Sequence, residues 1–79
     1  MLMSTERQLR IVLMLAGKPM TVSKIYQELR DDRECAAALR VIQRDIHDLR
    51  KLGIVQVVRK QSDGGAVYNC TAIHDALAA

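Results

Sequence analysis

Residues 39–52 constrain the fold most strongly, because their apolar and basic side chains separate onto opposite faces of a helix. At about 100° per residue, the apolar stripe contains Leu39, Ile42, Ile46 and Leu49. The basic stripe on the other side contains Arg40, Arg44, His47 and Lys51. The same register continues backwards through Cys35 and Arg33, and Gly53 is placed to end the helix. The pattern predicts a helix over 33–52, with one face in the core and the other free to hold a polyanion.

Two shorter helices are expected before this segment. Ser4 or Thr5 can cap a first helix over 4–16, which Gly17 and Pro19 would end. Its expected buried stripe, at the spacing i, i+3, i+4 and i+7, is Leu9, Val12, Leu13 and Ala16. Thr21 belongs to a short extended pair, 20–21, and is placed to cap a second helix over 22–30. That helix repeats the apolar spacing at Val22, Ile25, Tyr26 and Leu29.

A β-hairpin is expected after Gly53. Residues 54–60 are rich in β-branched side chains and predict a strand. Asp63-Gly64-Gly65 is typical of a hairpin turn whose glycines supply positive φ, and residues 66–71 predict the returning strand. Three helices followed by a two-stranded β-hairpin wing indicate an α+β fold, mainly α, of the winged helix-turn-helix type. Residues 1–79 are expected to form this single domain.

The chain is short and mildly basic. Its 79 residues carry a formal net charge of +3, and 49% of them are hydrophobic although Phe and Trp are absent. A core of this size is barely sufficient alone, which favours a homodimer. Because Tyr26 and Tyr68 are the only aromatic residues, stacking on single-stranded bases is disfavoured. Residues 40–60 hold six Lys or Arg and two Asp, so positive charge concentrates on the predicted long helix and wing.

The residue types that carry catalysis or bind metals form no recognisable site. Cys35 and Cys70 make no Cys-x-x-Cys pair, so we expect reduced thiols and no metal. The sequence has no Gly-rich phosphate loop and no Ser or Cys nucleophile beside a His, so neither enzymatic activity nor a cofactor is expected. The longest apolar run, 11–17, is too short to span a membrane. A soluble cytoplasmic protein without a membrane partner is therefore expected.

One pattern within residues 41–55 is more specific than periodicity, and it comprises Ile42, Arg44, Asp45, Ile46, Leu49 and Gly53. It resembles the recognition helix of DeoR-type bacterial transcription regulators, in which an Arg-Asp pair lies in an apolar frame before a Gly. Residues 17–25 are similar to the turn that leads into the second helix of that family, so the resemblance covers about 9–58. It implies the DNA-binding domain of a winged helix-turn-helix regulator of transcription, here a small repressor.

The side chains of the basic face are suited to DNA independently of this resemblance. A helix in the major groove contacts bases only with long side chains that project from it. Arg40 can bind guanine through two hydrogen bonds and Gln43 can bind adenine in the same way, while Arg44 can hold a phosphate or a base. His47 is either a pH-sensitive contact or simply a polar surface residue. Lys51 completes the basic stripe.

Charged residues outside that stripe have their own expected roles. Arg59 and Lys60 lie where the first strand approaches the wing tip, and they can reach a phosphate or the minor groove. The alternative is that they protect an exposed sheet edge. Asp45 lies between the two faces of the long helix, and its expected role is an ion pair within the protein, to Arg44 or Arg10.

Two functions from different classes follow. The first is a sequence-specific, double-stranded DNA-binding regulator that acts as a dimer and occludes a promoter. The second is a winged-helix protein interaction module or inhibitor, of phage origin for instance, that holds another protein and needs no DNA. Ala38 and Val41 stand where the family has Ser and Thr, and the net charge is modest, which favours the second function more than in an ordinary family member. Fold alone does not decide between them.

Overall fold

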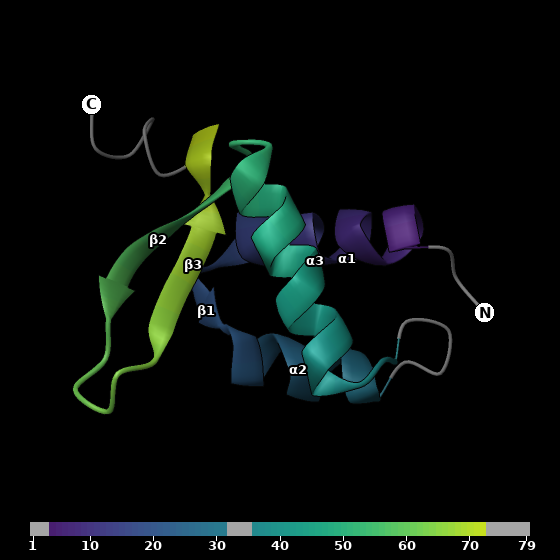
Figure 1. Cartoon of the computed structure of the whole chain (residues 1–79), viewed down its shortest axis with the longest axis horizontal. Coiled ribbons are helices and arrows are strands. Elements are labelled where there is room, and N and C mark those ends of the chain that lie inside the picture. Colours follow the sequence, from purple (N-terminus) through teal and green to yellow (C-terminus); the bar gives the residue numbers. More distant parts are fainter. Residues whose placement is uncertain (1–3, 32–35, 73–79) are drawn as a thin grey trace.

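In the part of the chain that the structure describes, three helices and three strands follow in the order helix, strand, helix, helix, strand, strand (Figure 1). The structure, a computed structural model, describes residues 4–31 and 36–72. The elements are α1 (Ser4–Gly17), β1 (Met20–Thr21), α2 (Val22–Arg30), α3 (Leu39–Lys51), β2 (Val55–Lys60) and β3 (Ala66–Cys70). No helix among these described residues combines the length and apolar character that crossing a lipid bilayer requires.

The strands form one antiparallel sheet in the order β1-β3-β2. β3 therefore lies in the middle, with Thr21 of β1 opposite its Val67 on one side and β2 paired along the other side. The predicted hairpin is formed by β2 and β3, and the extended pair 20–21 adds a third strand that joins the chain between α1 and α2 to the wing. The expected α+β, mainly helical, winged helix-turn-helix arrangement is confirmed.

The ends of α2 and of the hairpin follow local sequence signals. Thr21 has an extended backbone, and its Oγ1 accepts a hydrogen bond from the Lys24 backbone N–H at 3.2 Å, so the predicted cap of α2 is confirmed. The two hairpin strands are each one residue shorter than expected. Ile54 and Thr71 lie just outside them, where the Thr71 backbone N–H donates to the Ile54 carbonyl oxygen at 2.8 Å.

The core lies where the three helices meet the sheet. Nine side chains that are at most 6% exposed form one cluster within the described residues: Ile11, Leu15, Ile25, Leu29, Ile42, Ile46, Leu49, Val55 and Cys70. The Cys70 Sγ donates to the Val12 carbonyl oxygen at 3.3 Å, and burial raises the pKa of this thiol. Cys70 is therefore a packed thiol, as expected, whereas Cys35 lies outside the described residues.

The face that α1 buries differs from the predicted one. Leu9 and Leu13, which were expected in the core, are 59% and 61% exposed, whereas Ile11 and Leu15 are fully buried. Nearly every residue from 9 to 16 is apolar, so the spacing i, i+3, i+4 fits two faces of this helix. Arg7 explains which of the two faces is buried. It lies in the same i, i+4, i+8 row as Ile11 and Leu15, and it makes a specific contact with α3.

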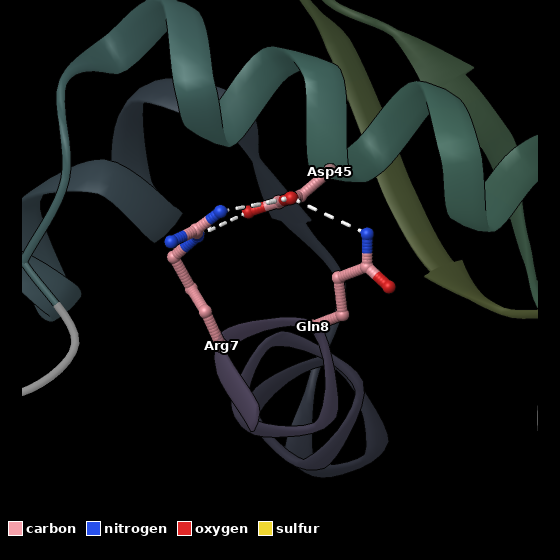
Figure 2. A network of polar contacts seen from close by, with 3 residues as sticks. All are labelled: Arg7, Gln8 and Asp45. Carbon is pink, nitrogen blue, oxygen red and sulfur yellow. Dashed lines mark hydrogen bonds and ion pairs between the residues drawn. The ribbon is translucent and has the colours of Figure 1, made fainter. Parts of the chain in front are cut away.

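That contact is a buried ion pair to Asp45 of α3, drawn in Figure 2. The Arg7 Nε atom donates to Oδ2 of Asp45 and its Nη2 atom donates to Oδ1 at 3.2 Å. Gln8 adds a third donor, from Nε2 to Oδ1 at 3.3 Å. Asp45 is only 2% exposed, so it belongs to the buried face of α3 rather than to the boundary between faces. Its expected role as an internal ion pair is confirmed, but the partner is Arg7 and not Arg44 or Arg10.

Helix α3 is shorter than the predicted 33–52. It begins at Leu39, after the non-helical residues 36–38, and the backbone of Ala38 is extended with no side chain to cap the helix. Ala37 packs against the core in this segment, and such a tertiary contact outweighs the high helix propensity of the three alanines at 36–38. The rest of the predicted start, 33–35, lies outside the described residues. Leu39, at the open end of the helix, is 39% exposed and not part of the buried stripe.

The ion pair between α1 and α3 leads to a prediction about stability. Replacement of Arg7 by Met should lower the free energy of unfolding by about 3 kcal/mol, because it leaves a buried carboxylate without its cation. The additional change Asp45→Asn removes that charge and should restore part of the loss. Chemical denaturation of the variants measures both effects.

The exposed pair between Lys24 and Glu28, whose Nζ and Oε1 atoms are 3.0 Å apart, provides the control. Glu28→Gln should cost less than about 1 kcal/mol. Equal losses of unfolding free energy in Arg7→Met and Glu28→Gln would show that the buried pair stabilises the fold no more than the exposed one.

Candidate nucleic-acid interface

The outer face of α3 carries five exposed side chains that can donate hydrogen bonds. They are the predicted residues Arg40, Gln43, Arg44, His47 and Lys51, and the structure leaves all of them accessible to solvent. From Arg40 to Lys51 they span about 16 Å along the helix axis, given the rise per residue. The structure thus presents these five side chains together, on one surface.

The opposite face of α3 explains why these side chains project outward. Ile42, Ile46 and Leu49 are at most 3% exposed and pack in the core, with Asp45 held beside them. Rotation of α3 about its axis would expose these apolar groups and break the ion pair to Arg7. The position of the basic face is therefore fixed by the core and not by contacts of its own.

The first turn of α3 is lined by small and apolar residues. Ala38 and Val41 border a surface hollow that is flanked by Arg40 and Arg44. The N-terminal amides of the helix have no side-chain cap here, since Ala38 supplies none. Backbone amides that lack an internal partner at a helix start can donate to an anion. The hollow therefore lies between two arginines and one helix N-terminus.

The wing carries the other two predicted residues, Arg59 and Lys60, and both are exposed. The pairing of β2 with β3 contains a bulge between Val57 and Arg59, so that Arg59 and not Val58 lies opposite Val67. The hairpin extends away from the helices in Figure 1. These two cations therefore lie on β2, as expected, and not on α3.

The hairpin turn is held by its own hydrogen bonds. The Gly64 N–H donates to the Gln61 carbonyl oxygen at 2.9 Å, and the Gln61 N–H donates to the Gly65 carbonyl oxygen at 2.7 Å. Gly64 has the positive φ that the sequence predicted, at 90°, but Gly65 does not, so that part of the prediction is wrong. Gly65 instead donates its N–H to Asp63 Oδ1 at 2.9 Å, and a Cβ atom at Gly65 would lie 3.1 Å from that oxygen.

Three cations that the sequence analysis did not assign also bear on this surface. Arg50 lies over the Tyr68 ring, with its Cζ atom 5.9 Å from the ring centroid, and so joins the last turn of α3 to the sheet. Lys18 and Lys24 line a hollow together with Arg59. Periodicity could not reveal the two lysines, because neither belongs to a stripe of like charges and only the fold brings them to the wing.

Comparisons with known proteins supply no assignment for this surface. No family model matches the chain, and no curated protein matches it. Among residues 4–31 and 36–72, no group of three His, Cys, Asp or Glu side chains is placed to hold a metal ion. The geometry and charge of the surface are therefore the observations on which a functional proposal rests.

Proposed function

We propose that this protein is a cytoplasmic, sequence-specific double-stranded DNA-binding regulator of transcription, a small repressor that inserts α3 into the major groove. The observation that carries the proposal is the separation of roles on α3. Its inner face is fixed by the core and a buried ion pair, while five long polar side chains project together from its outer face. Binding alone performs this function, and no catalytic step is proposed.

Specific contacts to bases are assigned to the first half of α3. The major groove is roughly 12 Å wide and accepts a helix, whose projecting side chains then reach base edges. Arg40 and Gln43 are one turn apart and can each make two hydrogen bonds to one base, guanine and adenine respectively. Both lie near the end of α3 where Ala38 and Val41 line a surface hollow. Their small side chains support a close approach of this end of the helix to the bases.

Contacts to phosphates are assigned to the cations that flank the base contacts. Arg44, Lys51, Arg59 and Lys60 are exposed and lie on two neighbouring elements, so they can follow the backbone on either side of the groove. His47 lies between them on the same helix face and can add a further donor. A repressor of this size would act by occupying the promoter and excluding polymerase.

The division between base and phosphate contacts gives the first functional prediction. Arg40→Ala and Gln43→Ala should each relax the preference at one base pair, at a cost of about 1–3 kcal/mol at that position. Arg44→Ala and Lys60→Ala should weaken binding to all duplexes and lower the slope of log affinity against log salt by about one unit each. Selection of duplexes from a random pool, followed by titration at several salt concentrations, measures both effects.

Matched controls come from α2, which carries an exposed Gln27 and an exposed Arg30. Gln27→Ala and Arg30→Ala should change neither the selected sequence nor the salt slope. If the parent protein enriches no sequence, or if the four α3 and wing variants behave like the α2 controls, the proposal is wrong.

Protein binding is the second candidate function, and the exposed leucines of α1 favour it. Leu9 and Leu13 are about 60% exposed, and they lie about 200° around the helix from the buried Ile11 row. Beside them, Val12, Ala16 and Ile54 line an open apolar hollow. One surface thus has both protruding apolar side chains and a space that such side chains can fill. Self-complementarity of this kind is the property of a two-fold interface.

We assign this surface to a second copy of the chain. The buried row of α1 packs in the core with the inner face of α3, and Leu9 and Leu13 lie on the other side of α1, so two copies joined here would keep both recognition helices free for the two half-sites of an operator. Leu13→Lys should convert a dimer into a monomer without loss of the folded state, whereas Leu39→Lys, at the start of α3, should leave the dimer intact. Light scattering coupled to size-exclusion chromatography measures the mass. A parent that stays monomeric at all concentrations and on its DNA would contradict this assignment.

A further inference from the structure

Three cations from three separate segments line one hollow beside the wing. Lys18 lies between α1 and β1, Lys24 lies in the first turn of α2, and Arg59 lies in β2 after the bulge. The hollow has a volume of about 280 Å³, and Thr21 and Gln61 add polar side chains to its lining. No acidic side chain of the described residues lines it.

The sheet explains why these cations meet. Val67 of β3 lies opposite Thr21 of β1 on one side and opposite Arg59 of β2 on the other. Neighbouring strands are about 4.8 Å apart, so the two outer strands bring the start of α2 within about 10 Å of Arg59. Val67 itself is buried and lines the hollow between them. The site is therefore held by backbone pairing and not by flexible side chains alone.

The bulge in β2 decides which side chain enters the hollow. Val57 lies opposite Tyr68, so a regular antiparallel ladder would place Val58 opposite Val67. The extra residue of the bulge places Arg59 there instead. The guanidinium of Arg59 thus joins the two lysines in the lining of the hollow, at a register position where a regular ladder would place an apolar side chain.

Three like charges around one hollow repel each other and are stabilised by a bound anion. Lys24 is paired with Glu28, with 3.0 Å between Nζ and Oε1, but both side chains of this pair are close to half exposed. The first turn of α2 contains no acidic residue, so the positive end of the helix dipole adds to the potential and is not neutralised locally. The contacts and charges therefore favour an anion of the size of a phosphate group.

We infer that this hollow binds one phosphate of the DNA backbone, held by Lys18, Lys24 and Arg59. The inference rests on the proposed function and extends it, because it adds two residues and a second element, α2, to the DNA-binding surface. The phosphate is that of a duplex whose major groove is occupied by α3. The hairpin and α2 then both contact the same DNA backbone.

The test uses the full chain and the duplex selected for it. Lys18→Gln and Lys24→Gln should each lower the slope of log affinity against log salt by about one unit, and the double variant should lower it by about two, with the selected sequence unchanged. Arg30→Gln, which removes an exposed cation at the other end of α2, is the matched control and should leave the slope unchanged. Glu28→Gln frees Lys24 from its partner and should strengthen duplex binding at low salt.

The salt titrations of the parent and of the lysine variants distinguish a failure of the phosphate site from a failure of the proposed function. If the parent binds the duplex and the two lysine variants keep the parent slope, the hollow is not a phosphate site although the regulator proposal stands. If the parent binds no duplex, the regulator proposal itself fails. Titration with inorganic phosphate alone distinguishes the source of the anion: amide shifts of Thr21 and Lys24 that appear with duplex and not with phosphate support the inference. Saturable shifts with phosphate, together with no shift of these amides on binding of the duplex, would overturn it in favour of a free-anion site.

Discussion

The ion pair between Arg7 and Asp45 is the interaction on which the arrangement of the helices depends. A carboxylate that is 2% exposed must be paired, and its cation comes from a helix 38 residues away in sequence. Helix α1 has two apolar faces, and only one of them brings Arg7 to Asp45. The pair therefore selects which face of α1 enters the core, and it also fixes the rotation of α3 that directs Arg40 and its neighbours outward.

The sheet adds a second constraint that acts on the wing. β3 is paired on both sides, with β1 on one and β2 on the other, so the hairpin is joined to the helical part of the chain through the backbone. Arg50 over the Tyr68 ring joins α3 to the same strand. The basic face of α3 and the cations of the wing are thus held in a defined relation. A rigid relation of this kind reduces the ordering cost of binding a rigid partner such as duplex DNA.

Features that depend on neighbouring residues were predictable from the sequence, and those that depend on distant ones were not. The Thr21 cap, the bounds of α2 and the positive φ of Gly64 follow from local chemistry and are confirmed. The rotation of α1 was mispredicted because an almost wholly apolar segment fits two faces, and the deciding partner lies on α3. The seven predicted DNA-binding side chains are all exposed. Lys18 and Lys24 were missed because only strand pairing brings them to Arg59.

We propose that α3 is held by its inner face so that its outer face can bind duplex DNA. The sharpest test of this proposal maps backbone amide chemical shifts while the parent protein is titrated with its selected duplex. We expect the largest shifts on the outer positions of α3, from Arg40 to Lys51, and on Arg59 and Lys60. Shifts confined to Leu9 and Leu13 on α1, or none at saturating duplex, would contradict it.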